Sequence, residues 1–317
     1  MRSSTAPPSR HPLLDVIYVT ASANDARFTR ICIASIRYFY PNVPIRLLAG
    51  GKLEHGLAEE LNRFWSVPLS TFPRCDWGWG FVKLEPLFGE HGQRFLVIDS
   101  DTVFSGPVLS SFANPDFPFV VDNERHTDES AENIYYNWHK LSTIGFPSCP
   151  PEFLFNTGQW LGTSGILKRD DFEDFIDWDQ MPPKLKYPDA FKNGDQGILN
   201  YIVNQKCQSN HLLVKRLPLM HWPGNGMKGY SVHSIIAGAA PSRIIHWAGF
   251  KSPWLNSLPG ADVLQFFEKF YYSKIPYGSI RRKFAIFRSP IVYWYKKIKL
   301  ALSSRWINSR KASYVSS

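Results

Sequence analysis

The sequence predicts an α/β fold in which helices flank a mostly parallel, doubly wound central sheet. Apolar runs rich in β-branched residues alternate along the chain with segments whose apolar residues recur every three or four positions. This alternation is typical of a doubly wound sheet. The apolar run 95–98 also leads without a break into Asp99-Ser100-Asp101. Such a run is typical of a strand buried on both faces of a parallel sheet.

The first part of the chain predicts a strand, a helix, a strand and a helix in succession, over residues 13–20, 31–38, 45–49 and 54–65. Pro41 and Pro44 end the first helix, and Gly50-Gly51 follows the second strand, as expected for residues that interrupt regular structure. The loop after the first strand contains no Gly-x-Gly-x-x-Gly pattern. The chain therefore lacks the main mark of a nicotinamide-dinucleotide site.

The later elements follow the same reasoning. Apolar patterns predict helices over residues 75–87, 169–178 and 194–203, and strands over residues 95–98, 117–121, 152–158 and 243–247. Residues 122–151 are polar and aromatic with little periodicity and are expected to form a long loop. Long loops in compact domains often cover or bind ligands.

Composition places the chain among globular proteins. Its 317 residues include 44% hydrophobic and 15% aromatic residues, enough for one large α/β domain and too many for a disordered chain. The four cysteines have no paired short spacings, so neither a zinc site nor a disulfide framework is expected. Residues 1–12 lack the apolar core of a signal peptide and are expected to form a flexible lead-in. These observations predict a cytoplasmic protein.

The positive charge is concentrated at one end of the chain. Of the 36 Lys and Arg residues, 12 lie between Lys269 and Ser317, where no Asp or Glu occurs, so the remainder holds 24 basic against 27 acidic residues. We therefore divide the chain into a domain, residues 13–272, and a basic aromatic tail, residues 273–317. This asymmetry is typical of an electrostatic docking segment.

The tail also predicts an amphipathic helix. Ser289 can cap a helix that starts at Pro290, and apolar residues recur every three or four positions at Phe284, Phe287, Ile291, Trp294, Ile298 and Ala301. A basic, aromatic helix of this kind suits peripheral binding to the inner, anionic face of a membrane. The alternative is a terminal helix that packs its aromatic stripe onto the domain. No nucleic-acid-binding motif accompanies the charge, so nucleic acid is not expected as a partner.

Asp99 and Asp101 are the first candidate site residues. They follow a predicted strand, and ligands of open α/β sheets bind beyond the carboxyl ends of the strands. Two neighbouring carboxylates repel each other unless they share a cation. The pair therefore predicts a divalent-metal site that holds a phosphorylated ligand. The alternative is a strand followed by an Asx-type turn.

Four separated stretches together resemble the retaining glycosyltransferases of family 8, from about Asp15 to Trp254. They are Asp99-Ser100-Asp101, Phe155-Asn156-Thr157-Gly158, Asp195-Gln196, and His246-Trp247-Ala248-Gly249 with Lys251 and Pro253-Trp254. The resemblance implies a GT-A fold with a Rossmann-like sheet, a nucleotide-sugar donor and a divalent cation. It also implies transfer of a hexose, from a UDP-sugar, to a saccharide acceptor. The basic tail would suit a lipid-linked acceptor.

The resemblance assigns roles residue by residue. Asp99, Asp101 and His246 look like the family's metal ligands, and two carboxylates with an imidazole suit Mn²⁺ better than Mg²⁺. Asp195 and Gln196 resemble the residues at the reaction centre, with Gln196 as a stabiliser of the transition state. The residues assigned to the substrate are Asn24, Lys83, Ser100, Asn156, Gly249 and Lys251.

Two departures from the family pattern concern the donor. Lys251 lies five positions after His246, with Ser252 before Pro253, whereas the family places its Lys six positions after the His. In the first loop, Ser22 and Asp25 replace the usual acidic and aromatic residues, although Asn24 is retained. These differences leave the identity of the base open.

Two other functions compete with the transferase. In a haloacid-dehalogenase-like phosphatase, Asp99 would be the nucleophile and Asp101 the general acid. That motif normally follows the first strand, whereas two predicted strands precede Asp99, and Asp170-Asp171 begins an ordinary predicted helix, not a second acidic motif. The other alternative is a non-catalytic sugar- or membrane-binding protein, against which the intact set of predicted metal ligands argues.

Overall fold

The computed structural model describes residues 13–72, 78–89, 92–124, 126–250, 252–290 and 294. The expectations for the lead-in 1–12, for Lys251 and for the tail after Pro290, apart from Trp294, lie outside these residues. 

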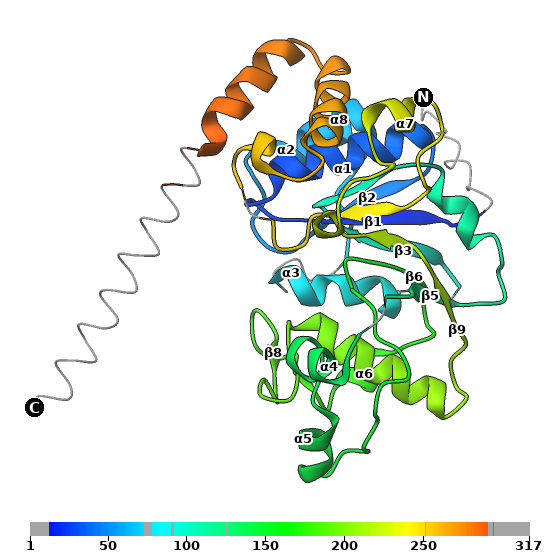
Figure 1. The fold of residues 1–317 in the computed structure, drawn as a ribbon. Helices are drawn as coiled ribbons and strands as arrows, with labels where there is room; N and C mark the ends of the chain where they lie inside the picture. Colours follow the sequence, from blue (N-terminus) through cyan, green and yellow to red (C-terminus); the bar gives the residue numbers. More distant parts are fainter. Residues whose placement is uncertain are drawn as a thin grey trace, which may run out of the picture.

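A six-stranded sheet forms the centre of the molecule (Figure 1). In spatial order its strands are β2 (Ile45–Ala49), β1 (Val16–Ala21), β3 (Arg94–Asp99), β6 (Gln159–Thr163), β5 (Phe119–Asp122) and β9 (Val214–Leu217). β1 is parallel to β2 and β3, and β5 is parallel to β9, whereas β6 is antiparallel to both of its neighbours. The sheet is parallel-dominated, as predicted.

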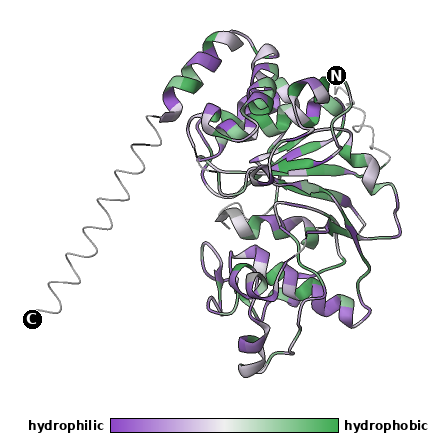
Figure 2. Ribbon diagram, viewed as in Figure 1, coloured by the Kyte–Doolittle hydropathy of each residue, from purple (hydrophilic) through white to green (hydrophobic). Residues whose placement is uncertain are grey.

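Helices cover both faces of this sheet (Figure 1). On one side lie α1 (Ala26–Phe39), α2 (Leu57–Trp65), α7 (Val232–Ile236) and α8 (Ala261–Ser273). On the other lie α3 (Gly78–Phe81), α4 (Asp128–Ile134), α5 (Trp138–Thr143) and α6 (Asp195–Gln208). Figure 2 shows the central strands as predominantly apolar, in green, which is consistent with a buried middle layer.

Each side of the sheet has its own hydrophobic core. Ile17 and Val19 of β1 belong to the core under α1 and α8, whereas Val16 and Tyr18 belong to the core on the α6 side. Successive strand residues point to opposite faces, so a strand covered on both faces needs apolar residues at every position. The continuous apolar runs in the sequence are explained in this way.

A small second sheet carries part of the candidate site. It contains β10 (Met220–His221), β11 (Ile244–His246) and β4 (Thr102–Phe104), in that order. β4 follows β3 after a two-residue turn and pairs antiparallel with β11, so that Thr102 lies opposite His246. The remaining strands, β7 (Ile176–Asp177) and β8 (Lys184–Leu185), pair with each other.

Several local predictions are wrong. Residues 152–158 do not form a strand, since β6 begins at Gln159, and the long loop 122–151 contains two short helices, α4 and α5. The helix predicted over residues 169–178 is a short 3₁₀ helix, Arg169–Phe172, followed by β7. The helix predicted over residues 75–87 is described from Gly78 and continues as a 3₁₀ helix, Val82–Phe88, with Pro86 inside it. In an α-helix the ring of Pro86 would clash with the carbonyl group of Val82.

Residues 278–290 form a helix, here called the tail helix, which is orange in Figure 1. Ser289 lies inside it and donates its hydroxyl to Ala285 O, so Ser289 does not cap a helix that starts at Pro290. Phe284 and Phe287, which are 70% and 71% exposed, point away from the domain. The packing of the aromatic stripe onto the domain is therefore wrong for the part of the tail that the structure describes.

Candidate active site

Three side chains with metal-binding atoms meet beyond the end of β3. Asp99 is the last residue of β3, Asp101 lies in the turn to β4, and His246 is the last residue of β11. The pairing of β4 with β11 brings the histidine to the turn, and the Trp247 backbone N–H donates to Asp101 O at 2.9 Å. Residues about 145 positions apart in the sequence thus share one site.

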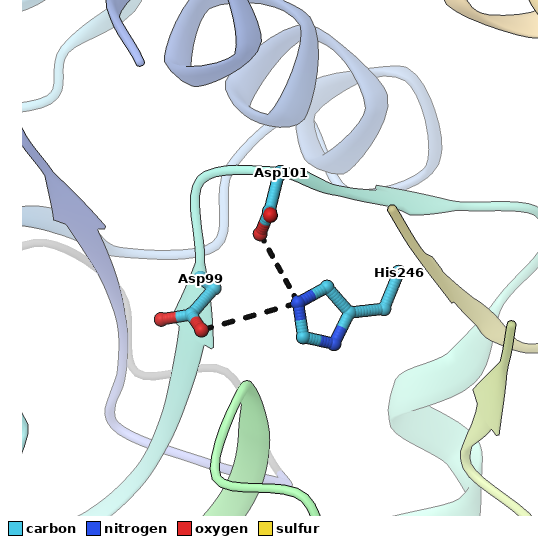
Figure 3. Close-up of side chains that lie close together, drawn as sticks. All are labelled: Asp99, Asp101 and His246. Atoms are coloured by element: carbon cyan, nitrogen blue, oxygen red, sulfur yellow. Dashed lines mark ion pairs between the residues drawn. The ribbon is translucent and has the colours of Figure 1, made fainter. Parts of the chain in front are cut away.

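The imidazole faces both carboxylates (Figure 3). His246 Nε2 lies 3.1 Å from Asp101 Oδ1 and 3.9 Å from Asp99 Oδ2. Burial lowers the pKa of His246, but Asp101 and Asp99 outweigh it, and the pKa is raised. Burial raises the pKa of Asp101, but the imidazole outweighs it, and the pKa is lowered. The site therefore favours a cation next to the two carboxylates.

These three residues fit a divalent cation. One ligand atom from each lies within 4.8 Å of the others, and two carboxylate oxygens with an imidazole nitrogen form a donor set that suits Mn²⁺. His246 Nδ1 is buried and has no hydrogen-bond partner among the described residues.

Asp99 is held from two further directions. Thr20, in β1, donates its hydroxyl to Asp99 Oδ1 at 2.8 Å, and the Lys83 ammonium lies 2.8 Å from Oδ1 and 3.0 Å from Oδ2. The Asp99 backbone N–H donates to Gly158 O at 2.8 Å. The carboxylate is therefore oriented before any ligand binds.

Lys83 is a buried cation between two carboxylates. Its ammonium also lies 3.5 Å from Asp195 Oδ2, at the start of α6. Burial disfavours the charged amine, but Asp195 and Asp99 outweigh it and hold the pKa of Lys83 above its usual value. Burial raises the pKa of Asp195 to about 6, although Lys83 acts in the opposite direction. Lys83 is therefore not a solvated helix residue, since its side chain is 2% exposed.

The other predicted residues differ in how freely they can meet a substrate. Asp195 is 1% exposed, whereas Gln196 is partly exposed and donates its amide to Ile134 O at 3.5 Å. Asn156 Oδ1 accepts the Gly158 N–H at 2.7 Å and thus forms a local turn. Ser100 is buried. The substrate roles of these residues stay predictions.

The two loops assigned to the donor are exposed at their tips. Asn24 is exposed in the turn between β1 and α1. Gly249 has φ +81° and no atom within 4 Å of an added Cβ, so glycine is required there by the backbone conformation and not by crowding. The predicted contact of Gly249 with the substrate stays a prediction.

Sequence reasoning missed several residues that shape this site. Thr20 orients Asp99. A Cβ on Gly158 would lie 2.7 Å from His246 Nδ1, and one on Gly80 would lie 2.7 Å from Asp195 Oδ1. Gly158 stands in the Phe-Asn-x-Gly motif, which marked it as a residue of interest. Nothing in the sequence, however, connected Gly158 with His246 or Gly80 with Asp195.

A parallel-dominated, Rossmann-like sheet with these flanking helices is the GT-A fold of glycosyltransferases. Among solved structures, the chain is similar to the galactosyltransferase LgtC in complex with donor and acceptor sugar analogues. The TM-score is 0.51 and the identity 14%, over 84% of this chain and 99% of LgtC. An active-site mutant of LgtC matches with a TM-score of 0.50 and 16% identity, over 82% of this chain and 97% of that chain.

The bifunctional glycosyltransferase WbbM, in its apo structure, matches with a TM-score of 0.50 and 15% identity, over 86% of this chain and 51% of WbbM. The chain thus spans about half of that protein. No family model matches the sequence, and no curated protein matches it either. The resemblance inferred from the sequence is confirmed at the level of the fold.

Proposed function

We propose that this chain is a metal-dependent retaining glycosyltransferase that moves a hexose from a UDP-sugar to a saccharide acceptor. The observation that carries the proposal is the convergence of Asp99, Asp101 and His246 at the end of β3, in a fold shared with LgtC. Ligands of open α/β sheets bind at such strand ends. The solved LgtC structure contains donor and acceptor sugar analogues.

The three convergent side chains would hold Mn²⁺. Such a cation acts as a Lewis acid and offsets the charge that develops on a departing nucleoside diphosphate. Lys83 adds a fixed positive charge beside Asp99, and its burial strengthens its electrostatic effect on an anionic ligand.

Asp195 and Gln196 have different proposed roles. Because Asp195 is buried and paired with Lys83, it orients the ammonium group and does not act as the base. Gln196, with part of its side chain accessible, contacts the sugar and stabilises the transition state with its amide dipole. Asn24, Ser100, Asn156, Gly249 and Lys251 complete the proposed substrate contacts.

The tail supports a membrane-associated acceptor. Arg281, Arg282 and Arg288 form ion pairs with Glu60, Glu268 and Glu54 of the domain, so this basic side of the tail helix faces inward. The exposed side carries Ile280, Phe284, Phe287 and Trp294. We therefore propose that the tail inserts aromatic residues into the surface of an anionic membrane, with Lys283 and the other basic residues of the tail close to the headgroups.

No spanning segment is present in the part of the chain that the structure describes, because none of its helices is both long and apolar enough to cross a bilayer. The proposed association is accordingly peripheral. Sedimentation with vesicles that contain anionic lipid tests it: a chain truncated after Lys274 is expected to stay in the supernatant. Equal sedimentation of the truncated and full chains would contradict this part of the proposal.

Turnover of nucleotide-sugars tests the main proposal. A panel of UDP-sugars is expected to show Mn²⁺-dependent release of UDP that Asp99→Ala abolishes, since the substitution removes one proposed ligand. Steady release of inorganic phosphate from simple phosphoesters would favour the phosphatase alternative. Metal-independent sugar binding without turnover would favour a non-catalytic protein.

A further inference from the structure

Glu268, on α8, is a buried carboxylate that binds two arginines from different parts of the chain. Arg27, in the first turn of α1, donates Nε to Glu268 Oε1 at 2.6 Å. Arg282, on the tail helix, donates Nε to Glu268 Oε2 at 2.9 Å. The Glu268 residue is 0% exposed. Each carboxylate oxygen is thus occupied by a different guanidinium group.

Arg27 makes a second contact that reaches toward the candidate active site. Its Nη1 donates to Pro253 O at 2.9 Å. Pro253 belongs to the loop 247–254, which follows His246 and contains Gly249. Arg27 itself comes two residues after the turn 22–25 that carries Asn24. Its backbone therefore follows one of the two segments that the proposed function assigns to the substrate, and its guanidinium group holds the other.

The orientation of this guanidinium depends on Glu268. The group is planar, and its donors have fixed relative directions, so the Nε bond to Glu268 determines where Nη1 points. Charge-assisted hydrogen bonds of this kind are among the stronger ones in proteins. A shift of Glu268 would move the Nη1 donor away from Pro253 O and release the loop.

We propose that Glu268 is a positioning residue that transmits the docking of the tail helix to the loop 247–254. When Arg282 is docked, Glu268 is held from both sides and Arg27 holds the loop. When the tail helix leaves the domain, Glu268 gains freedom and the loop loosens. The tail is then a determinant of donor affinity as well as a membrane anchor. This inference rests on the proposed function for the identity of the donor, but the coupling itself does not.

Arg281 provides a matched control within the same helix. It also forms an ion pair with a carboxylate of the domain, Glu60, at 3.2 Å. Glu60 is bound in addition by Arg30 and by the Tyr271 hydroxyl, and this second network includes neither Glu268 nor Arg27. Loss of either arginine removes one ion pair of the tail helix, but only loss of Arg282 removes a contact to Glu268.

The test compares Arg282→Met with Arg281→Met in the full chain. Hydrogen exchange of backbone amides in residues 248–257 is measured first, without ligand. Exchange in Arg282→Met is expected to rise about fivefold, within the usual range of coupling between sites, and to stay near the wild-type rate in Arg281→Met. Equal exchange in both variants, whether raised or unchanged, would overturn the proposal.

Kinetics with the UDP-sugar and Mn²⁺ provide the second readout. Arg282→Met is expected to raise the donor KM about fivefold with kcat within twofold of wild type. Arg27→Lys, which keeps the charge but cannot reproduce the two directed bonds, is expected to have the same effect with little change in Tm. An unchanged KM in both variants would overturn the proposal. If the wild type turns over no nucleotide-sugar, the proposed function fails, and the exchange experiment still decides the coupling.

Discussion

Gly158→Ala is the most direct test of the candidate metal site. Gly158 does not have a left-handed φ, so alanine is compatible with its backbone. The added Cβ, however, would lie 2.7 Å from His246 Nδ1, whereas ordinary contacts begin at 3.4 Å. The same Cβ would overlap His246 Cε1 even more closely. The imidazole must therefore move by more than about 0.7 Å, which exceeds the about 0.2 Å over which metal–ligand distances vary. Because the ring is buried, it cannot yield without leaving its position between Asp99 and Asp101.

We expect Gly158→Ala to weaken Mn²⁺ binding by about 10- to 100-fold, the range found when the support of a metal ligand is lost. Mn²⁺ titration followed by electron paramagnetic resonance measures the free ion directly and needs no substrate. Gly89→Ala is the control, because Gly89 has φ −71° and its Cβ would meet only ordinary contacts at 3.6 and 3.8 Å. Wild-type Mn²⁺ affinity in a folded Gly158→Ala chain would refute the reasoning.

Three further predictions concern two charged residues of the site and the exposed aromatic residues of the tail helix. Lys83→Met leaves Asp99 and Asp195 without their buried cation and should destabilise the chain by about 3–5 kcal/mol in urea unfolding; a loss below about 1 kcal/mol would contradict the buried pairing. Because the folded-state pKa of Asp195 is raised from 3.8 to about 6, the folded state keeps a proton that the unfolded state has lost, so stability should fall by about 3 kcal/mol as the pH rises from about 4 to about 6. Asp195→Asn should remove this fall, and identical pH profiles of unfolding for the two chains would count against it. Replacement of both Phe284 and Phe287 by Ser should reduce sedimentation with anionic vesicles at least tenfold. Tm should not fall, since both rings are exposed. Unchanged sedimentation would show that the aromatic side does not meet the lipid.

The residues that the sequence identified correctly are those whose surroundings are set by their neighbours in the chain. The run 95–98 forms a strand buried on both faces, and Asp99 ends it, because continuous apolar character has few other solutions in a sheet between two helical layers. The helix predicted from residue 194 begins at Asp195, whose carboxylate suits the first turn of a helix. By contrast, the strand predicted over residues 152–158 is wrong, because a local Asx turn, in which Asn156 accepts the Gly158 N–H, competes with strand formation.

Lys83 shows the limit of such reasoning. A lysine on a short helix is normally solvated, whereas this one is buried next to the carboxylates of Asp99 and Asp195. The sequence by itself determined the sheet-forming runs, the helical segments of strong periodicity and the candidate set of metal ligands. The tertiary structure decided that Arg27 and Arg282 share Glu268, that Gly158 lies against His246 and that the basic side of the tail helix faces the domain. Apolar periodicity depends on residues a few positions apart and can therefore be recognised in the sequence. A contact between distant residues depends on how the whole chain closes around its core, and no local pattern encodes it.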